Sequence, residues 1–249
     1  MVAIQHLENA PVVEGLIDFR VRPGDGISLG ALENLGRAIE DRYPVRKEAK
    51  RFHSSIEVKD GAQASNSITS ELIGYRFERS DARSIVQVQL GGFSLSHLAP
   101  YDAWESLIAD AQVIWKEYQD IVKPSRVVRV ATRFINRIEL PLSGELDFDE
   151  FLSVGPRVPQ GLAQNVGEFL TRIAVADPKS GATVVVIQAL ESFNPKNSTL
   201  PVLLDIDVFK DVEFDPDSLD HWKLLSELRH LKNQAFFSSI TDKTLGLIK

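Results

Sequence analysis

Two stretches of this chain alternate apolar and polar residues in the same way and end alike. VVEGLIDFRVRP runs from Val12 to Pro23, and VATRFINRIELP runs from Val130 to Pro141. Their first and their last residues are both 118 residues apart (130 − 12 and 141 − 23). Alternation of this kind is typical of a half-buried strand. Internal similarity constrains the fold strongly, and the shared offset predicts that the chain is an internal duplication of one structural unit.

The same offset aligns two further pairs of segments. YDAWESLIADAQVIWKEYQDIV starts at Tyr101, and LDHWKLLSELRHLKNQAFFSSI starts at Leu219. Each has an aspartate two residues before a tryptophan and apolar residues every three or four positions, which predicts a helix with an aspartate N-cap. The offset also aligns the alternating runs 84–90 and 202–208. Three separated anchors with one offset favour duplication over chance.

Each unit is therefore predicted to have the order β-α-β-β-β-α. For residues 1–123 we expect strands at 12–21, 52–59, 74–79 and 84–95 and helices at 29–42 and 101–122. For residues 124–249 we expect strands at 126–140, 167–176, 182–190 and 201–212 and helices at 148–154 and 219–240. The predicted class is α+β. The two units are expected to join into one packed domain, a curved, mainly antiparallel sheet with helices on one side.

This layout is similar to the duplicated TATA-box-binding-protein-like architecture, with one strand fewer in each unit, and a pair of ferredoxin-like units is the alternative. The chain also carries the motifs APVVEGLID from Ala10, YDAW from Tyr101, RFINRI from Arg133 and FFSSITD from Phe236. In these it resembles a sporadically distributed family of uncharacterised bacterial proteins of about this length. The resemblance implies a fold and a bacterial origin but no activity.

Composition narrows the classes of function. Apolar residues make up 43% of the chain and charged residues 25%, a balance typical of globular proteins. The absence of cysteine excludes disulfides, thiolate zinc sites and cysteine nucleophiles. The net charge of −7 disfavours broad, non-specific nucleic-acid binding, which needs a basic surface. With no secretory signal pattern and no apolar run of membrane-spanning length, we expect a cytoplasmic protein without membrane contact.

Three arginines are the first candidate binding residues. Arg129, Arg133 and Arg137 have the same parity on an expected strand, so they share one face, while Val130 and Phe134 point the other way. Such a row can bind phosphate, carboxylate or a protein partner through forked hydrogen bonds. The alternative is a solvated face whose arginines pair with acidic neighbours.

An acidic pair is the second candidate. Asp205 and Asp207 share a strand face and could hold Mg²⁺. If the two strands lie in one sheet, these aspartates could instead neutralise Arg133 and Arg137, which would remove both functional hypotheses.

The repeat also aligns Asp18 with Asn136, and these two could line a polar cleft or join the two halves. Buried polar groups of this kind need hydrogen-bond partners. The histidines form no ligand pair. His221 and His230, nine residues apart on one expected helix, have a poor ligand spacing, so we expect structural or surface roles.

No catalytic motif of high specificity is found. We therefore expect a binding or protein-interaction module without a cofactor, with a protein partner or a second copy as its ligand. The alternative hypotheses are a Mg²⁺-dependent enzyme acting on a phosphorylated or nucleic-acid substrate and a small-molecule binder with a central cleft.

Overall fold

The computed structural model describes residues 7, 9–57, 65–142, 146–193 and 198–249. The strands have these bounds: β1 (Val12–Arg22), β2 (Val45–Glu57), β3 (Ser65–Glu78), β4 (Ser84–Gln89), β5 (Gly92–Leu98), β6 (Arg126–Pro141), β7 (Leu170–Ala176), β8 (Thr183–Leu190) and β9 (Thr199–Phe214). The α-helices are α1 (Leu32–Ala38), α2 (Trp104–Val122), α3 (Asp220–Ser239) and α4 (Asp242–Leu247), and the 3-10 helices are η1 (Leu29–Ala31) and η2 (Phe148–Glu150).

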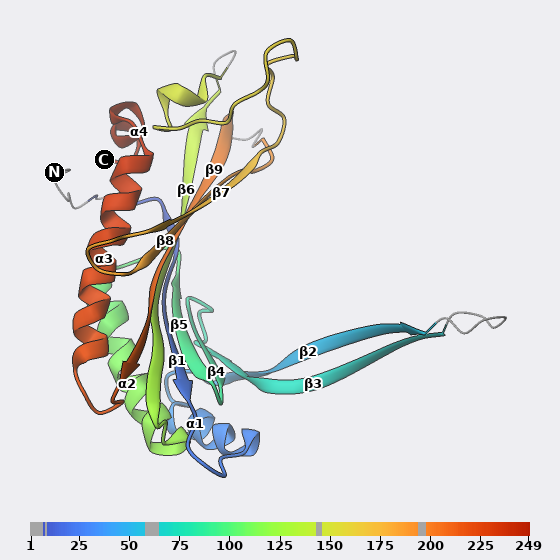
Figure 1. The fold of residues 1–249 in the computed structure, drawn as a ribbon, viewed down its shortest axis with the longest axis vertical. Coiled ribbons are helices and arrows are strands. Elements are labelled where there is room, and N and C mark those ends of the chain that lie inside the picture. The colour runs from blue at the N-terminus through green and yellow to red at the C-terminus, as the bar shows by residue number, and fades with distance from the viewer. Residues whose placement is uncertain (1–6, 8, 58–64, 143–145, 194–197) are drawn as a thin grey trace.

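These strands form a single sheet. Among the described residues it has nine strands in the order β2-β3-β4-β5-β1-β6-β9-β8-β7, and every neighbouring pair is antiparallel. The sheet is curved, and the long helices α2 and α3 lie on one side of it (Figure 1). The predicted α+β class, antiparallel sheet and one-sided helices are confirmed.

The first half of the chain has one strand more than expected. The stretch 84–95 is not one strand but the hairpin of β4 and β5, which turns at Leu90 and Gly91. A Cβ at Gly92 would lie 2.2 Å from the carbonyl oxygen of Phe19, so only glycine fits where β5 starts beside β1. Gly91 thus lies in the turn, and Gly92 starts the next strand.

Several expected boundaries also differ. β2 begins at Val45 rather than at residue 52, and residues 58 and 59 of the expected strand lie outside the described residues. The expected helix 148–154 is only the 3-10 turn η2. The aspartate N-caps are wrong, because Ala103 and Leu219 precede α2 and α3 and neither makes a side-chain cap.

The structure does not confirm the duplication. The offset of 118 aligns the run 84–90, which contains β4, with part of β9. In the sheet β9 neighbours the first strand of its half, β6, whereas β4 is separated from β1 by β5. The offset therefore aligns two strands that occupy different positions in the sheet relative to the first strand of their half. The two halves do meet directly, through the long antiparallel pairing of β1 with β6.

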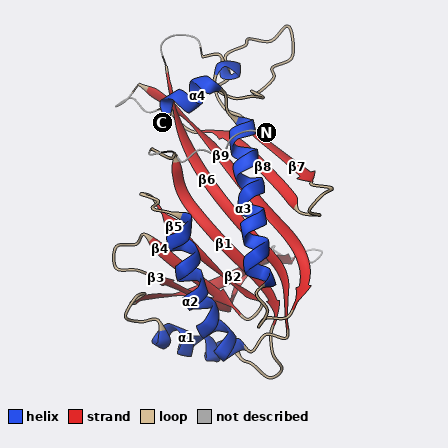
Figure 2. Ribbon diagram, turned by 90° about the vertical axis from the view of Figure 1, so that its left-hand side faces the viewer, coloured by secondary structure: helices blue, strands red, loops and turns tan. Residues whose placement is uncertain are grey.

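The core lies between the sheet and its two long helices (Figure 2). Helix α2 packs on β1 and β5, and α3 packs on β6, β8 and β9, so each helix covers its own side of the β1–β6 seam. No helix in the described part of the chain is both long and apolar enough to cross a membrane.

An aromatic cluster joins the helices across that seam. The ring of Phe19 on β1 lies 5.1 Å from Trp115 of α2, 5.2 Å from His221 and 5.2 Å from Trp222 of α3, all edge to face. His221 is 1% exposed, and neither of its ring nitrogens has a hydrogen-bond partner among the described residues. Burial lowers the pKa of His221 from 6.5 to about 4. The expected structural role of this histidine agrees with its position.

This lowered pKa predicts acid sensitivity. Between pH 6.5 and pH 4 the unfolded chain binds a proton at His221 that the folded protein does not, so stability falls as the pH falls through this window. We expect His221→Phe to remove that loss. As the pH is lowered from 6.5 to 4, the wild type should therefore lose about 2–3 kcal/mol more in the free energy of unfolding than the variant does.

Urea unfolding at a series of pH values measures this. His230→Phe is the matched control, because His230 lies on the same helix but is exposed. Parallel pH profiles for the wild type and His221→Phe would contradict the prediction.

Candidate functional site

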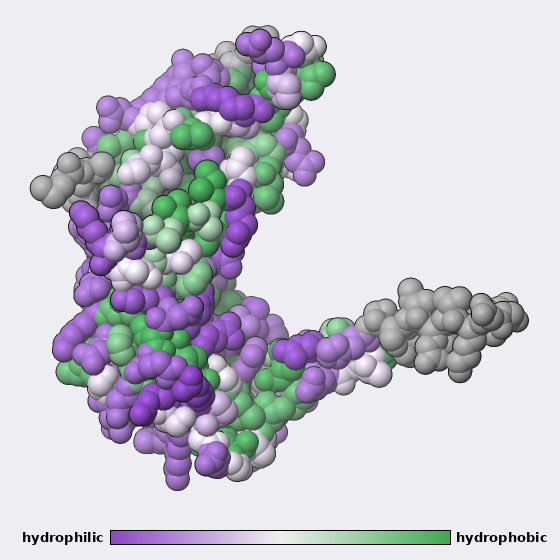
Figure 3. All heavy atoms as spheres, in the orientation of Figure 1, coloured by the Kyte–Doolittle hydropathy of each residue, from purple (hydrophilic) through white to green (hydrophobic). Residues whose placement is uncertain are grey.

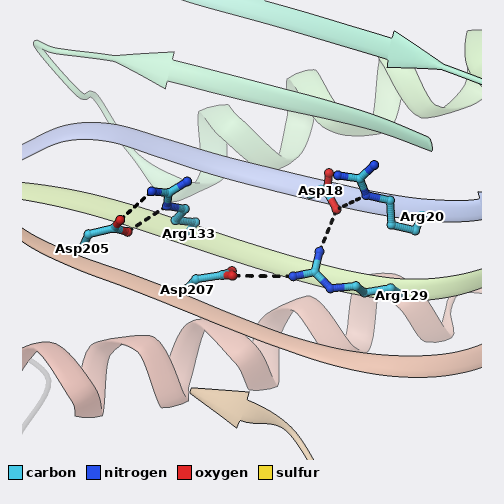
Figure 4. Close-up of polar contacts among 6 residues, drawn as sticks. All are labelled: Asp18, Arg20, Arg129, Arg133, Asp205 and Asp207. Carbon is cyan, nitrogen blue, oxygen red and sulfur yellow. Dashed lines mark hydrogen bonds and ion pairs between the residues drawn. The ribbon is translucent and has the colours of Figure 1, made fainter. Parts of the chain in front are cut away.

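Arg129 and Arg133 of the arginine row lie on the face of the sheet that the helices leave open (Figure 4). Val130, Phe134 and Ile138 of β6 are at most 2% exposed and point into the core, as the alternation predicted. Arg129 and Arg133 project from the opposite face, and Arg137 has the same parity. A register shift between Val127 and Arg129 marks where the regular alternation begins.

Arg133 binds Asp205 of β9 through two hydrogen bonds. Its Nε and Nη2 donate to the two carboxylate oxygens at 2.8 and 2.5 Å. Asp205 is 8% exposed, so this is a largely buried carboxylate held by a forked guanidinium. The hydrogen bonds that Arg133 donates to Asp205 raise the pKa of Arg133. These contacts favour the alternative in which an aspartate of the neighbouring strand neutralises Arg133.

Arg129 lies between two other carboxylates. Its Nη1 donates to Asp18 of β1 at 3.0 Å, and its Nη2 lies 3.6 Å from Asp207 of β9. Arg20 donates to the same oxygen of Asp18 at 3.1 Å (Figure 4). Burial raises the pKa of Asp18, and the positive charges of Arg20 and Arg129 oppose that rise. Asp207 thus pairs with Arg129 rather than with Arg137.

Arg137 has different partners from those expected. It donates to Glu191 at 2.6 Å and also to Glu139 on its own strand. Neither Asp205 nor Asp207 reaches it in the described structure. All three arginines of the row therefore already have carboxylate partners within the chain.

The open face is hollowed where Arg129 and Arg133 lie. This open-face hollow has a volume of about 320 Å³, and its charged lining consists of Asp18, Arg20, Arg129, Arg133 and Asp207. Because these groups bind one another, an incoming anion would have to displace a carboxylate. The row is thus a charge network that holds β1, β6 and β9 together on this face.

A double-mutant cycle tests that structural role. We expect Arg133→Met to lower the free energy of unfolding by about 1–3 kcal/mol, because it leaves the Asp205 carboxylate buried without its partner. Adding Asp205→Leu should restore most of the loss. Urea denaturation measures all four proteins of the cycle.

The control is Arg22→Met, which breaks the exposed ion pair with Glu213 and should cost at most about 1 kcal/mol. A double variant no more stable than Arg133→Met alone would show that the pair does not act as a unit.

The described residues contain no group of three or more histidine, aspartate or glutamate side chains arranged to hold a metal ion. Both oxygens of Asp205 already accept hydrogen bonds from Arg133. We therefore expect millimolar Mg²⁺ to leave the melting temperature unchanged beyond the effect of matched ionic strength, since a ligand of the folded state must stabilise it. A rise that Asp205→Asn abolishes would instead support the Mg²⁺ site.

Asp18 and Asn136 do not share a cleft. Asp18 lines the open-face hollow, whereas Asn136 lies on the helix side, where its amide donates to the carbonyl of Leu204 at 2.9 Å. Asn136 lines a second space, of about 660 Å³, between α3, the segment 99–105 and the start of β1. We call this space the helix-side cavity.

The helix-side cavity contains residues that the sequence reasoning missed. Its lining includes Tyr101, Trp104, Phe134, Arg229 and Lys232. A signal was present, because Leu224, Leu228, Lys232, Phe236 and Ile240 follow one another at intervals of four on the apolar stripe of the last long helix. A lysine in the middle of such a stripe is unusual, since lysine is seldom buried without a partner.

Comparison of the sequence with protein-family models and with curated proteins found no match.

Proposed function

We propose that this protein is a non-catalytic protein-interaction module and that the hairpin of β2 and β3 is its contact element. We call this hairpin the arm. The proposal rests on the observation that the arm projects from the sheet. The arm extends away from the body on the side opposite the helices (Figure 1). Figure 3 shows that it stands clear of the rest of the molecule, with a concave surface beside it.

The arm has only two strands over most of its length. β4 pairs with β3 from Gly74 to Glu78, but the β2–β3 pairing continues outward from Leu72 to Ser65. A two-stranded ribbon by itself is marginally stable in water. A partner surface that covers the ribbon would stabilise it.

The arm also exposes large apolar side chains. Phe52 and Ile68 are each 70% exposed. Phe52 is directly opposite Ser70, and Ile68 is opposite residue 54, so both lie diagonally on one face of the ribbon. Apolar side chains grouped on a projecting element are typical of a contact surface.

This proposal differs from the first expectation in its location. The arginine row was the expected contact surface, but Arg129, Arg133 and Arg137 are all paired with carboxylates of the same chain. The net charge of −7 favours a protein partner over nucleic acid. The partner is either another protein or a second copy of this chain.

The internal duplication and the bacterial, cytoplasmic origin remain part of the proposal. Duplication is supported by one common feature of the halves. In each, the last strand pairs with the first, as β5 does with β1 and β9 with β6, and a long helix follows. The resemblance to the uncharacterised bacterial family and to the duplicated TATA-box-binding-protein-like layout remains a prediction.

Site-specific photo-crosslinking in the expressing cell tests the arm. We expect a photoreactive phenylalanine at Ser70, which is exposed opposite Phe52, to crosslink to one defined protein or to a second copy. The same residue at Val113, which is exposed on α2, is the positional control. Denaturing electrophoresis and mass spectrometry identify the product.

The double variant Phe52→Ser/Ile68→Ser should reduce the crosslink at Ser70 at least roughly tenfold, because it removes the apolar contact but little that is buried. Val154→Ser/Leu162→Ser, at two other exposed positions, should leave it unchanged. A crosslink no stronger at Ser70 than at Val113, or one that survives the arm variant, would refute the proposal.

A further inference from the structure

The helix-side cavity contains a lysine that is not ion-paired within the described residues, although Asp102 and Glu105 also line this space. Lys232 points from α3 toward β6, and its Nζ lies 3.8 Å from the centre of the Phe134 ring. The ring face attracts the ammonium, but an aromatic ring satisfies none of its three N–H donors. Lys232 has no hydrogen-bond or ion-pair partner in the described part of the chain. Burial, with a smaller contribution from Arg229, lowers its pKa from 10.5 to about 7.

A second polar group without a partner lies beside the same ring. The hydroxyl of Tyr101 is buried and has no hydrogen-bond partner among the described residues. The Tyr101 ring packs edge to face on Phe134, with 5.4 Å between ring centres. Buried polar groups in folded proteins are nearly always paired, because an unpaired one costs free energy. The buried hydroxyl of Tyr101 and the half-buried amine of Lys232, both unpaired at one ring, thus point to a missing acceptor.

The rest of the cavity can hold an apolar body next to that acceptor. Trp104, Phe134 and Phe236 line it. Arg229 adds a second cation at the rim, where it lies over the Trp104 ring and donates to Glu105 at 3.1 Å. A few polar groups converging in an aromatic-lined space of several hundred Å³ are typical of a small-molecule site.

We propose that the helix-side cavity binds a small organic carboxylate, whose carboxylate group accepts hydrogen bonds from Lys232 and Tyr101 and whose apolar or aromatic body packs against Trp104, Phe134 and Phe236. The carboxylate supplies both the negative charge and the acceptor oxygens that these donors lack. This site is independent of the arm and lies on the other side of the sheet.

Lys232 is placed for binding rather than for stability. A charge held in this position without a partner opposes folding. Methionine at 232 would continue the apolar stripe between Leu228 and Phe236, so Lys232→Met should fold and melt at or above the wild-type temperature near neutral pH. This variant therefore separates loss of binding from loss of the fold.

Thermal melting with a defined set of probes tests the proposal. The probes are butyrate, phenylacetate and indole-3-acetate at millimolar concentration, with phenylacetamide as the uncharged analogue. We expect at least one carboxylate to raise the melting temperature of the wild type and phenylacetamide to have no effect. Affinity should fall roughly tenfold or more in Lys232→Met, and to a smaller extent in Tyr101→Phe. Lys223→Met, an exposed change on the same helix, should bind like the wild type.

Protection from acetylation places the ligand at the cavity. Near neutral pH, acetic anhydride should react readily with Lys232, since part of its population is the neutral amine. A bound carboxylate should slow this reaction and leave that of Lys223 unchanged, as peptide mass spectrometry would measure. The proposal is overturned if none of the three carboxylates protects Lys232, or if Lys232→Met is stabilised by them as much as the wild type.

Discussion

The antiparallel pairing of β1 with β6 is the constraint on which the rest of the structure depends. It joins the two halves of the chain into one sheet and fixes which residues of both halves face the helices. On the helix side, it places Phe19 where rings from α2 and α3 meet, so one ring anchors a helix from each half. On the open side, the same pairing places Asp18 within reach of Arg129. A shift of one residue in this register would exchange the two faces, and both the core and the charge network would be lost.

Charged side chains are paired on the open face of the sheet, whereas polar groups on the helix side lack partners in the described chain. On the open face, Arg129 and Arg133 each have carboxylate partners on neighbouring strands, and these partners are largely buried. Such pairs offset the cost of removing charges from water but leave little capacity for another ion. On the helix side, the Tyr101 hydroxyl is buried without a hydrogen-bond partner, and the half-buried Lys232 has no ion-pair partner in the described chain. The row of arginines therefore has little capacity to bind another anion, whereas the charge of Lys232 is still unpaired in the described chain.

Particular elements show how far the sequence predicted the fold. The alternation in β1, β6 and β9 reflects the fact that each of these central strands has one face in the core. The residues that face the core could therefore be predicted from the sequence. The hairpin at Gly92 was missed, because the need for glycine comes from the carbonyl of Phe19 far away in the sequence. The arm was underestimated because the outer parts of β2 and β3 pair only with each other, while β4 reaches only from Gly74 to Glu78 of β3. The pairing of Arg133 with Asp205 was one of the alternatives that the sequence left open, but that of Arg137 with Glu191 was not, because Glu191 lies beyond the end of β8.

By itself, the sequence determined the α+β class, the antiparallel strands with their inner and outer faces, the two long helices and the absence of cysteine chemistry. These follow from local periodicity and composition, which do not depend on how the segments of the chain are arranged in space. Tertiary structure alone decided which strands are neighbours, which carboxylate meets each arginine, and that Asp18 and Asn136 lie on opposite faces. It also decided that Lys232 and Tyr101 meet at one ring. Pairing and burial depend on contacts between residues far apart in the sequence, 72 positions for Arg133 and Asp205 and 111 for Asp18 and Arg129, and local periodicity does not specify such contacts.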